Sequence, residues 1–190
     1  MTSDQQAEFE RMHGYYVSQG ERYSFSELWQ RVVKARIELL ESFAKVKDTD
    51  ADWSPSTEAW SIREIVHHVL NSSRNTRQLV SALSVGETGD SSQVDPLRAA
   101  TDISMDELRD ELRDDGIEWT TVIHQLPPRP SIEPTAPHSM FGELHARAWF
   151  LFQRTHDLDH KGQIESVLTA DAYPENLDNS DKPRNMEAGG

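Results

Sequence analysis

The chain has 190 residues, of which 19 are Lys or Arg and 33 are Asp or Glu, so its formal net charge is −14 at pH 7. This charge opposes binding to nucleic acid and to anionic membrane surfaces. The sequence contains no cysteine, which excludes disulfides, thiolate metal ligands and a catalytic thiol supplied by the protein itself. The length favours one domain, and a hydrophobic content of 36% is low enough to indicate polar tails.

The two ends of the sequence are the candidate tails. Residues 1–10 have neither a basic start nor an apolar run, so no signal peptide is expected. No segment approaches the roughly 20 apolar residues that span a bilayer. We therefore expect a cytoplasmic protein with an N-terminal tail at 1–20, one folded domain at 21–170 and a flexible C-terminal tail at 171–190.

Three segments begin with the same helix-start signal, Ser-x-x-Glu. In this capping box the Ser oxygen accepts from a backbone N–H of the first turn, and the Glu side chain reaches back to the Ser backbone. Each box is flanked by an apolar pair that can form a hydrophobic staple, such as Trp60 with Ile65. With one apolar stripe each, these segments predict helices at 25–47, 62–84 and 105–126.

A fourth helix is predicted at 140–170, where apolar residues cover more than half of the circumference. No alternating pattern typical of a β-strand competes, so the predicted fold class is all-α, a four-helix bundle with long connections. The connection at 85–103 can span the length of a helix, which makes a crossover between the second and third helices the expected topology. The wide apolar surface of the fourth helix also permits a homodimer.

Two histidines share one side of the fourth helix. His156 and His160 are four residues apart, one turn along the same face, and Trp149 and Phe152 lie within about 60° of them by helical arithmetic. Buried imidazoles need hydrogen-bond partners or a metal, and this spacing lets a helix offer two nitrogens to one ion. The pair therefore indicates either a metal site or hydrogen-bonded core histidines.

A third metal ligand has to come from another helix. His67 and His68 are adjacent in the second predicted helix, so only one of them can face the bundle interior. His68 lies at the edge of the apolar stripe, whereas His67 points roughly 100° further away. The helical geometry selects His68. His138, in the loop before the fourth helix, remains a possible contributor.

Two sequence runs resemble motifs of the DinB/YfiT-like superfamily. They are WSIREIVHHV, which begins at Trp60, and HDLDHKGQI, which begins at His156. The resemblance implies a four-helix bundle that holds one divalent metal, such as nickel or zinc, with three histidines. Its ligands correspond to His68, His156 and His160, the same three residues that the helical geometry selects.

Three neutral imidazoles leave at least one metal position open, as in catalytic rather than closed structural sites. The resemblance implies two enzymatic functions: bacillithiol- or mycothiol-dependent thiol transfer, and metal-dependent hydrolysis. The absence of cysteine is compatible with a sulfur nucleophile that arrives with a small thiol cofactor. We favour thiol transfer to a small electrophile. The alternatives are the hydrolase and a non-enzymatic stress or interaction protein with a structural metal.

Three further residues are candidates for supporting the site. Gln163 shares the face of His156 and is placed to hydrogen-bond a ligand imidazole or substrate. Glu64 lies one turn before His68 and is a candidate to support that ligand, although its place in the capping box at Ser61 already explains why a Glu is there. Arg36 falls within the apolar stripe of the first helix, so it either extends to the surface or binds an anionic substrate.

Overall fold

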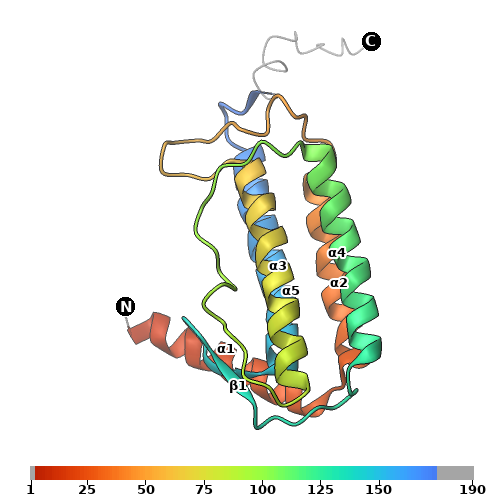
Figure 1. The fold of residues 1–190 in the computed structure, drawn as a ribbon. Helices are drawn as coiled ribbons and strands as arrows, with labels where there is room; N and C mark the ends of the chain where they lie inside the picture. Colours follow the sequence, from red (N-terminus) through yellow and green to blue (C-terminus); the bar gives the residue numbers. More distant parts are fainter. Residues whose placement is uncertain (1–2, 175–190) are drawn as a thin grey trace, which may run out of the picture.

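The computed structural model describes residues 3–174 of the chain (Figure 1). Within these residues it contains five α-helices and one antiparallel pair of short strands. The elements are α1 Ser3–Arg22, α2 Phe25–Ser42, α3 Ile62–Ser84, α4 Met105–Gln125, β1 Thr135–His138, β2 Gly142–His145 and α5 Ala146–Leu168.

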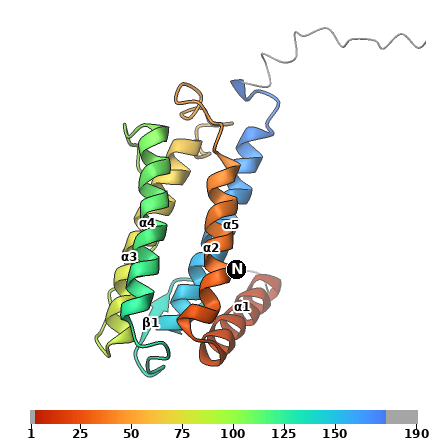
Figure 2. The same ribbon diagram turned by 90° about the vertical axis from the view of Figure 1, so that its right-hand side faces the viewer.

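Helices α2 to α5 form the predicted four-helix bundle. Figures 1 and 2 show α2 and α5 running in one direction and α3 and α4 in the other. After α3, the chain returns along the outside of that helix before α4 begins, so the crossover segment 85–104 makes α3 and α4 parallel. The all-α fold class is confirmed, with the small hairpin as an addition.

All three predicted capping boxes are present. The side chains of Ser24, Ser61 and Ser104 each accept from the backbone N–H of the Glu three residues later, and each Glu accepts from its cap backbone. Two orphan backbone donors are satisfied at each helix start. The starts of α2, α3 and α4 therefore coincide with the prediction, while α2 ends at Ser42 rather than near residue 47.

The apolar core consists of two clusters at opposite ends of the bundle. The cluster at the α1 end includes Phe25, Trp119 and Phe150, and the other includes Leu39 and Ile164. Helix α5 contacts α1, α2, α3 and β2, so it is the central helix of the molecule. Between the two clusters each bundle helix carries buried polar side chains, which form a polar layer across the middle of the bundle: Arg36, His68, Ser72, Ser73, Thr76, Asp115, Gln153, His156 and Asp157.

Residues 1–20 are not a tail in the described part of the chain, because residues 3–22 form α1, which lies across one end of the bundle (Figure 2). Tyr16 of α1 is fully buried, and its ring lies 5.2 Å from that of Phe141 and 6.3 Å from that of Phe152. The Ser-x-x-Glu signal that begins α2, α3 and α4 is absent from the start of α1. Helix α1 is stabilised by its packing against the bundle, and helix propensity and capping patterns carry no information about such tertiary contacts.

The predicted helix start at 140 is also wrong, because a hairpin occupies residues 135–145. Gly142 has a φ of +72°, a left-handed conformation that favours glycine. A right-handed α-helix cannot continue through this residue. The strands are only four residues long, so they show too little alternation to be recognised. Of the predicted C-terminal tail at 171–190, residues 175–190 lie outside the described residues.

None of the helices within residues 3–174 combines the length and the apolar character that a membrane span requires.

The docking of α1 depends on a close approach at Gly20. A Cβ atom there would lie 2.6 Å from His145 Cε1 and 2.9 Å from the Ala148 backbone nitrogen. We expect Gly20→Ala to lower the free energy of unfolding by about 1–3 kcal/mol, because the helix cannot pack without shifting. The matched control is Gly14→Ala, whose Cβ would meet no atom within 4 Å and should stabilise α1 by roughly 0.5–1 kcal/mol. Equal effects of the two substitutions in urea unfolding would contradict the docking of α1.

Candidate metal centre

Three histidines from two helices meet in the polar layer of the bundle. The Nε2 atom of His156 lies 3.3 Å from Nε2 of His68 and 3.2 Å from Nε2 of His160. The three side chains together offer ring nitrogens that all lie within 4.8 Å of one another. The structure thus brings together the three residues that the sequence analysis selected.

Hydrogen bonds on the far side of two of these rings determine which nitrogen carries the proton. His68 Nδ1 lies 2.9 Å from the carbonyl oxygen of Pro96, and His160 Nδ1 lies 2.9 Å from Oε1 of Gln163. Both oxygens can only accept, so each Nδ1 is protonated and each Nε2 keeps its lone pair. Two lone pairs therefore face the Nε2 atom of His156, an arrangement that a cation stabilises.

The environment favours the neutral form of His68 and His156. Burial lowers the pKa of His68, and the neighbouring His160 lowers it further. Burial, followed by His160 and His68, lowers the pKa of His156 well below its ordinary value. Neutral imidazole is the form that binds metals. Tetrahedral zinc with Zn–N bonds of about 2.0–2.1 Å separates ligand nitrogens by roughly 3.3 Å, so the observed spacing fits a divalent ion.

The crossover segment supplies two groups that the sequence analysis missed. One is the Pro96 carbonyl that orients His68, and the other is Asp95, whose Oδ1 lies 3.5 Å from Nε2 of His68. The loop has no hydrophobic periodicity, so nothing in the sequence indicates which of its polar residues faces the bundle. The carboxylate of Asp95 is the nearest negative charge to the histidines among the described ion pairs.

The other predicted site residues take different positions. Gln163 contacts His160, as proposed. The Glu64 carboxylate instead accepts from the backbone of Ser61 and from Arg98, so it serves the helix cap. His67 pairs with the side chain of Asn71 on the next turn and lies outside the three-histidine group.

His138 lies beside the histidine group rather than in it. Its Nδ1 accepts from the backbone nitrogens of Met140 and Phe141, at 3.1 and 3.3 Å, so its Nε2 carries the proton in the neutral ring. The ring centroid lies 4.6 Å from that of Phe152. Burial lowers the pKa of His138 to about 4. His138 is therefore a neutral donor near the site at pH 7.

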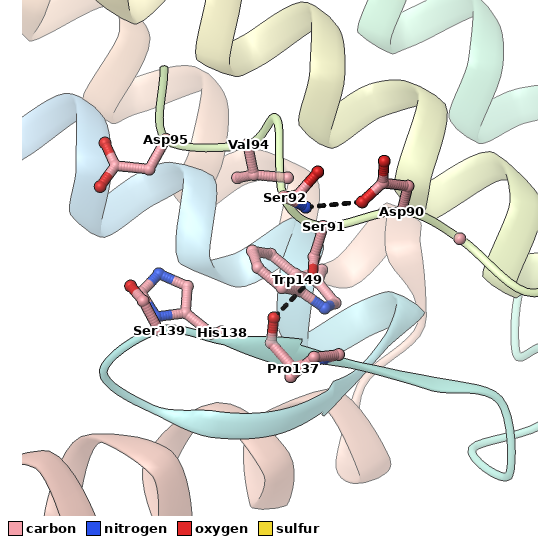
Figure 3. A pocket seen from close by; sticks show the side chains of 10 residues that line it. Asp90, Ser91, Ser92, Val94, Asp95, Pro137, His138, Ser139 and Trp149 are labelled. Atoms are coloured by element: carbon pink, nitrogen blue, oxygen red, sulfur yellow. Dashed lines mark hydrogen bonds between the residues drawn. The ribbon is translucent and has the colours of Figure 1, made fainter. Parts of the chain in front are cut away.

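Two cavities adjoin the histidines. The inner one, of about 340 Å³, reaches the centre itself, since its lining is Asp95, His138, Met140, Phe141, Phe152, Thr155, His156, Asp159 and His160. The outer one, of about 580 Å³, lies between the crossover segment, the hairpin and Trp149 (Figure 3). Asp95 and His138 line both, and neither lining contains a Lys or Arg. Because they share Asp95 and His138, the two cavities lie side by side.

The wall between the crossover segment and the hairpin is fixed by direct contacts. Ser91 Oγ donates to the carbonyl oxygen of Pro137 at 2.6 Å, and the Asp90 carboxylate accepts from the Ser92 backbone at 2.8 Å (Figure 3). Gly89 packs against the Leu79 side chain of α3, which a Cβ at this position would displace. These contacts hold the loop that carries Asp95.

A comparison with protein families adds an independent result. The family model of the DinB superfamily matches residues 31–164. The chain belongs to the DinB superfamily. The match includes all three clustered histidines, Gln163 and the whole crossover segment. A search of curated proteins found none that matches.

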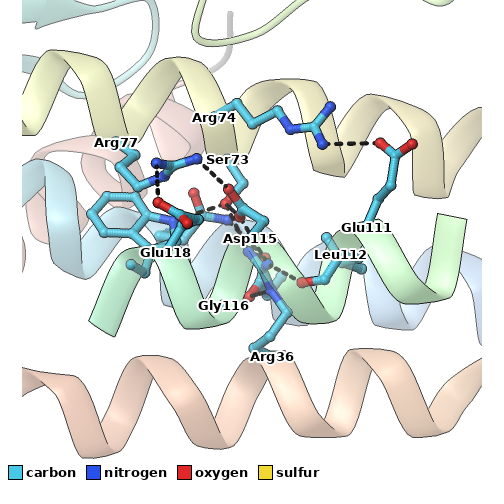
Figure 4. A network of polar contacts seen from close by, with 12 residues as sticks. Arg36, Ser73, Arg74, Arg77, Glu111, Leu112, Asp115, Gly116 and Glu118 are labelled. Atoms are coloured by element: carbon cyan, nitrogen blue, oxygen red, sulfur yellow. Dashed lines mark hydrogen bonds and ion pairs between the residues drawn. The ribbon is translucent and has the colours of Figure 1, made fainter. Parts of the chain in front are cut away.

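In this DinB protein Arg36 neither extends to the surface nor faces a substrate, so both predictions for it are wrong. Its guanidinium is buried and donates to Asp115 at 3.1 Å and to Ser73 at 2.9 Å (Figure 4). It also donates to Asp157 at 2.9 Å. Burial opposes the charge, but Asp157 and Asp115 raise the pKa of Arg36 overall. The partners come from α3, α4 and α5, so Arg36 joins α2 to the other three bundle helices.

The Arg36 network predicts a large loss of stability when it is broken. Arg36→Met leaves the carboxylates of Asp115 and Asp157, both with fully buried side chains, without their shared cation. We expect the free energy of unfolding to fall by about 3–5 kcal/mol in urea titrations. The control is Arg74→Met, which removes a half-exposed ion pair with Glu111 and should cost less than about 1 kcal/mol. Similar losses in both variants would refute the role of the network.

The low pKa of His138 predicts a specific pH dependence. Below pH 6.5 the unfolded chain protonates residue 138, whereas the folded chain does not until about pH 4, so stability falls as the pH falls. When the pH is lowered from 7 to 5, the free energy of unfolding should fall in both proteins. We expect the fall to be about 2 kcal/mol smaller in His138→Asn than in the original chain, both measured after chelator treatment. The asparagine oxygen can keep accepting from the backbone. Parallel pH profiles would exclude this effect.

Proposed function

We propose that this DinB-superfamily protein is a divalent-metal-dependent enzyme that transfers a low-molecular-weight thiol, bacillithiol- or mycothiol-like in type, to a small electrophile. The observation that carries the proposal is the position of the three histidines. Their Nε2 atoms converge where His156 and His160 line a cavity of about 340 Å³, a size that suits a small molecule.

In this proposal His68, His156 and His160 hold one ion, zinc or nickel. A divalent ion on three neutral imidazoles keeps a position for a further ligand and acidifies a thiol that is placed there. The chain's own groups prepare the ligands: Pro96 and Gln163 accept the outer ring protons of His68 and His160, so both rings present lone pairs to the centre.

The lining of the inner cavity supports thiol transfer over hydrolysis. Phe141, Phe152 and Met140 provide an apolar wall that excludes water from a small electrophile. The neutral His138, protonated on Nε2, is the residue that would donate a hydrogen bond to the electrophile.

A purely structural metal is less well supported. Closed structural sites take four protein ligands, whereas the cluster in the described chain, residues 3–174, contains three. Two of these three line a cavity, which gives a small molecule access to them. The cytoplasmic location and the homodimer expected from the sequence remain predictions.

Removing one histidine tests the proposal. With protein purified without an affinity tag and reloaded with zinc or nickel, we expect one ion per chain and consumption of monochlorobimane with a small thiol. His160→Ala should lower metal affinity more than the roughly 10–100-fold expected when Gln163→Leu removes only an outer hydrogen bond. Turnover should fall in the same order.

The matched control is His67→Ala, which removes the histidine next to His68 in the sequence but outside the cluster. It should retain the ion and the turnover. A loaded protein that consumes no electrophile with any small thiol would refute the transferase. Loss of the metal in His67→Ala, with retention in His160→Ala, would refute the ligand assignment.

A further inference from the structure

The inner cavity contains two carboxylates that form no ion pair with a Lys or Arg among residues 3–174. Asp95 and Asp159 both line it, and both are exposed to it rather than buried in the protein. Among the ion pairs of residues 3–174, Asp95 contacts only His68, and Asp159 forms none. Their charges are therefore available to whatever enters the cavity.

The lining of the outer cavity is also acidic. The outer cavity adds a third carboxylate, Asp90, to Asp95, and its lining also contains no Lys or Arg. The chain has 19 basic residues, so their absence from both linings is a property of the site. Among the side chains of the two linings, a ligand with carboxylates of its own would meet like charge and no Lys or Arg.

The charges at the centre indicate what the thiol carries besides sulfur. The two positive charges of a divalent ion are balanced by Asp95 and Asp159, and a thiolate adds one further negative charge. An ammonium group on the same molecule restores neutrality, whereas a carboxylate adds to the imbalance. The rings of Phe141 and Phe152 in the same wall also suit a cation.

Building on the proposed function, we propose that the thiol substrate is an aminothiol whose sulfur lies at His68, His156 and His160 and whose ammonium group binds Asp95 and Asp159. The distance from the centre to Asp95 is suitable, and Asp159 lines the same cavity. Asp95 Oδ1 lies 3.5 Å from Nε2 of His68, and a two-carbon spacer separates sulfur from nitrogen by roughly 3–4 Å. A short aminothiol can therefore reach the carboxylate and the centre at once.

Three thiols of matched size test this specificity: cysteamine, 2-mercaptoethanol and mercaptoacetate, whose second groups are positive, neutral and negative. The protein is loaded with cobalt(II), and the sulfur-to-cobalt absorption band reports binding. We expect cysteamine to bind tightest and mercaptoacetate weakest, with about three- to tenfold between successive thiols at low salt. High salt should compress this range, because the carboxylates are exposed.

The decisive comparison uses Asp95→Asn combined with Asp159→Asn. The three thiols differ in intrinsic acidity, so the informative quantity is the change in their affinity ratios between the original chain and the double variant. In the double variant, the affinity ratios of the three thiols should approach those expected for a site that does not distinguish their charges. Asp90→Asn, which removes an outer-cavity carboxylate that already accepts from Ser92, should leave them nearly unchanged.

The outcomes separate the two proposals. If all three thiols change the cobalt spectrum but the double variant keeps the original ratios, the aminothiol assignment is wrong and thiol transfer stands. If none of the thiols changes the spectrum of cobalt-loaded protein, the thiol transferase itself falls, and this assignment falls with it.

Discussion

The buried guanidinium of Arg36 is the interaction on which the arrangement of the bundle depends. It joins α2 to Asp157 of α5, to Asp115 of α4 and to Ser73 of α3, so one side chain fixes four helices relative to one another. Apolar side chains tolerate small sliding between helices, whereas two buried carboxylates on one cation do not. Because Asp157 directly follows His156, this constraint also fixes the height at which α5 presents its histidines to α3.

The centre therefore belongs to the fold and is not an addition to its surface. Two apolar clusters occupy the ends of the bundle, and the polar layer between them contains both the Arg36 network and the histidines. Burial makes His68 and His156 weaker bases, which opposes their protonation and favours a metal instead. Burying the polar layer costs free energy, because its groups lose contact with water. The apolar clusters on either side offset this cost by burying large side chains such as Trp119 and Phe150.

The sequence predicted what short-range rules determine. The capping boxes at Ser24, Ser61 and Ser104 located three helix starts, and helical angles separated His68 from His67. The failures have long-range causes. Helix α1 lacks the Ser-x-x-Glu signal of α2, α3 and α4 and is held by Tyr16, and the hairpin is too short for a visible alternation. The partners of Arg36 lie between 37 and 121 residues away. No local pattern contains that information.

The crossover segment shows both a property that the sequence predicts and contacts that it does not predict. Its length alone predicted parallel α3 and α4, but its residues gave no sign that Pro96 orients His68 or that Asp95 faces the centre. The helices supply the histidines, whose positions the packed bundle constrains, whereas the loop and hairpin supply most of the remaining cavity wall. Substitutions in a loop disturb less packing than substitutions in a core. In such an architecture metal binding is constrained by the fold, while substrate choice can change through residues such as Asp95 without loss of the bundle.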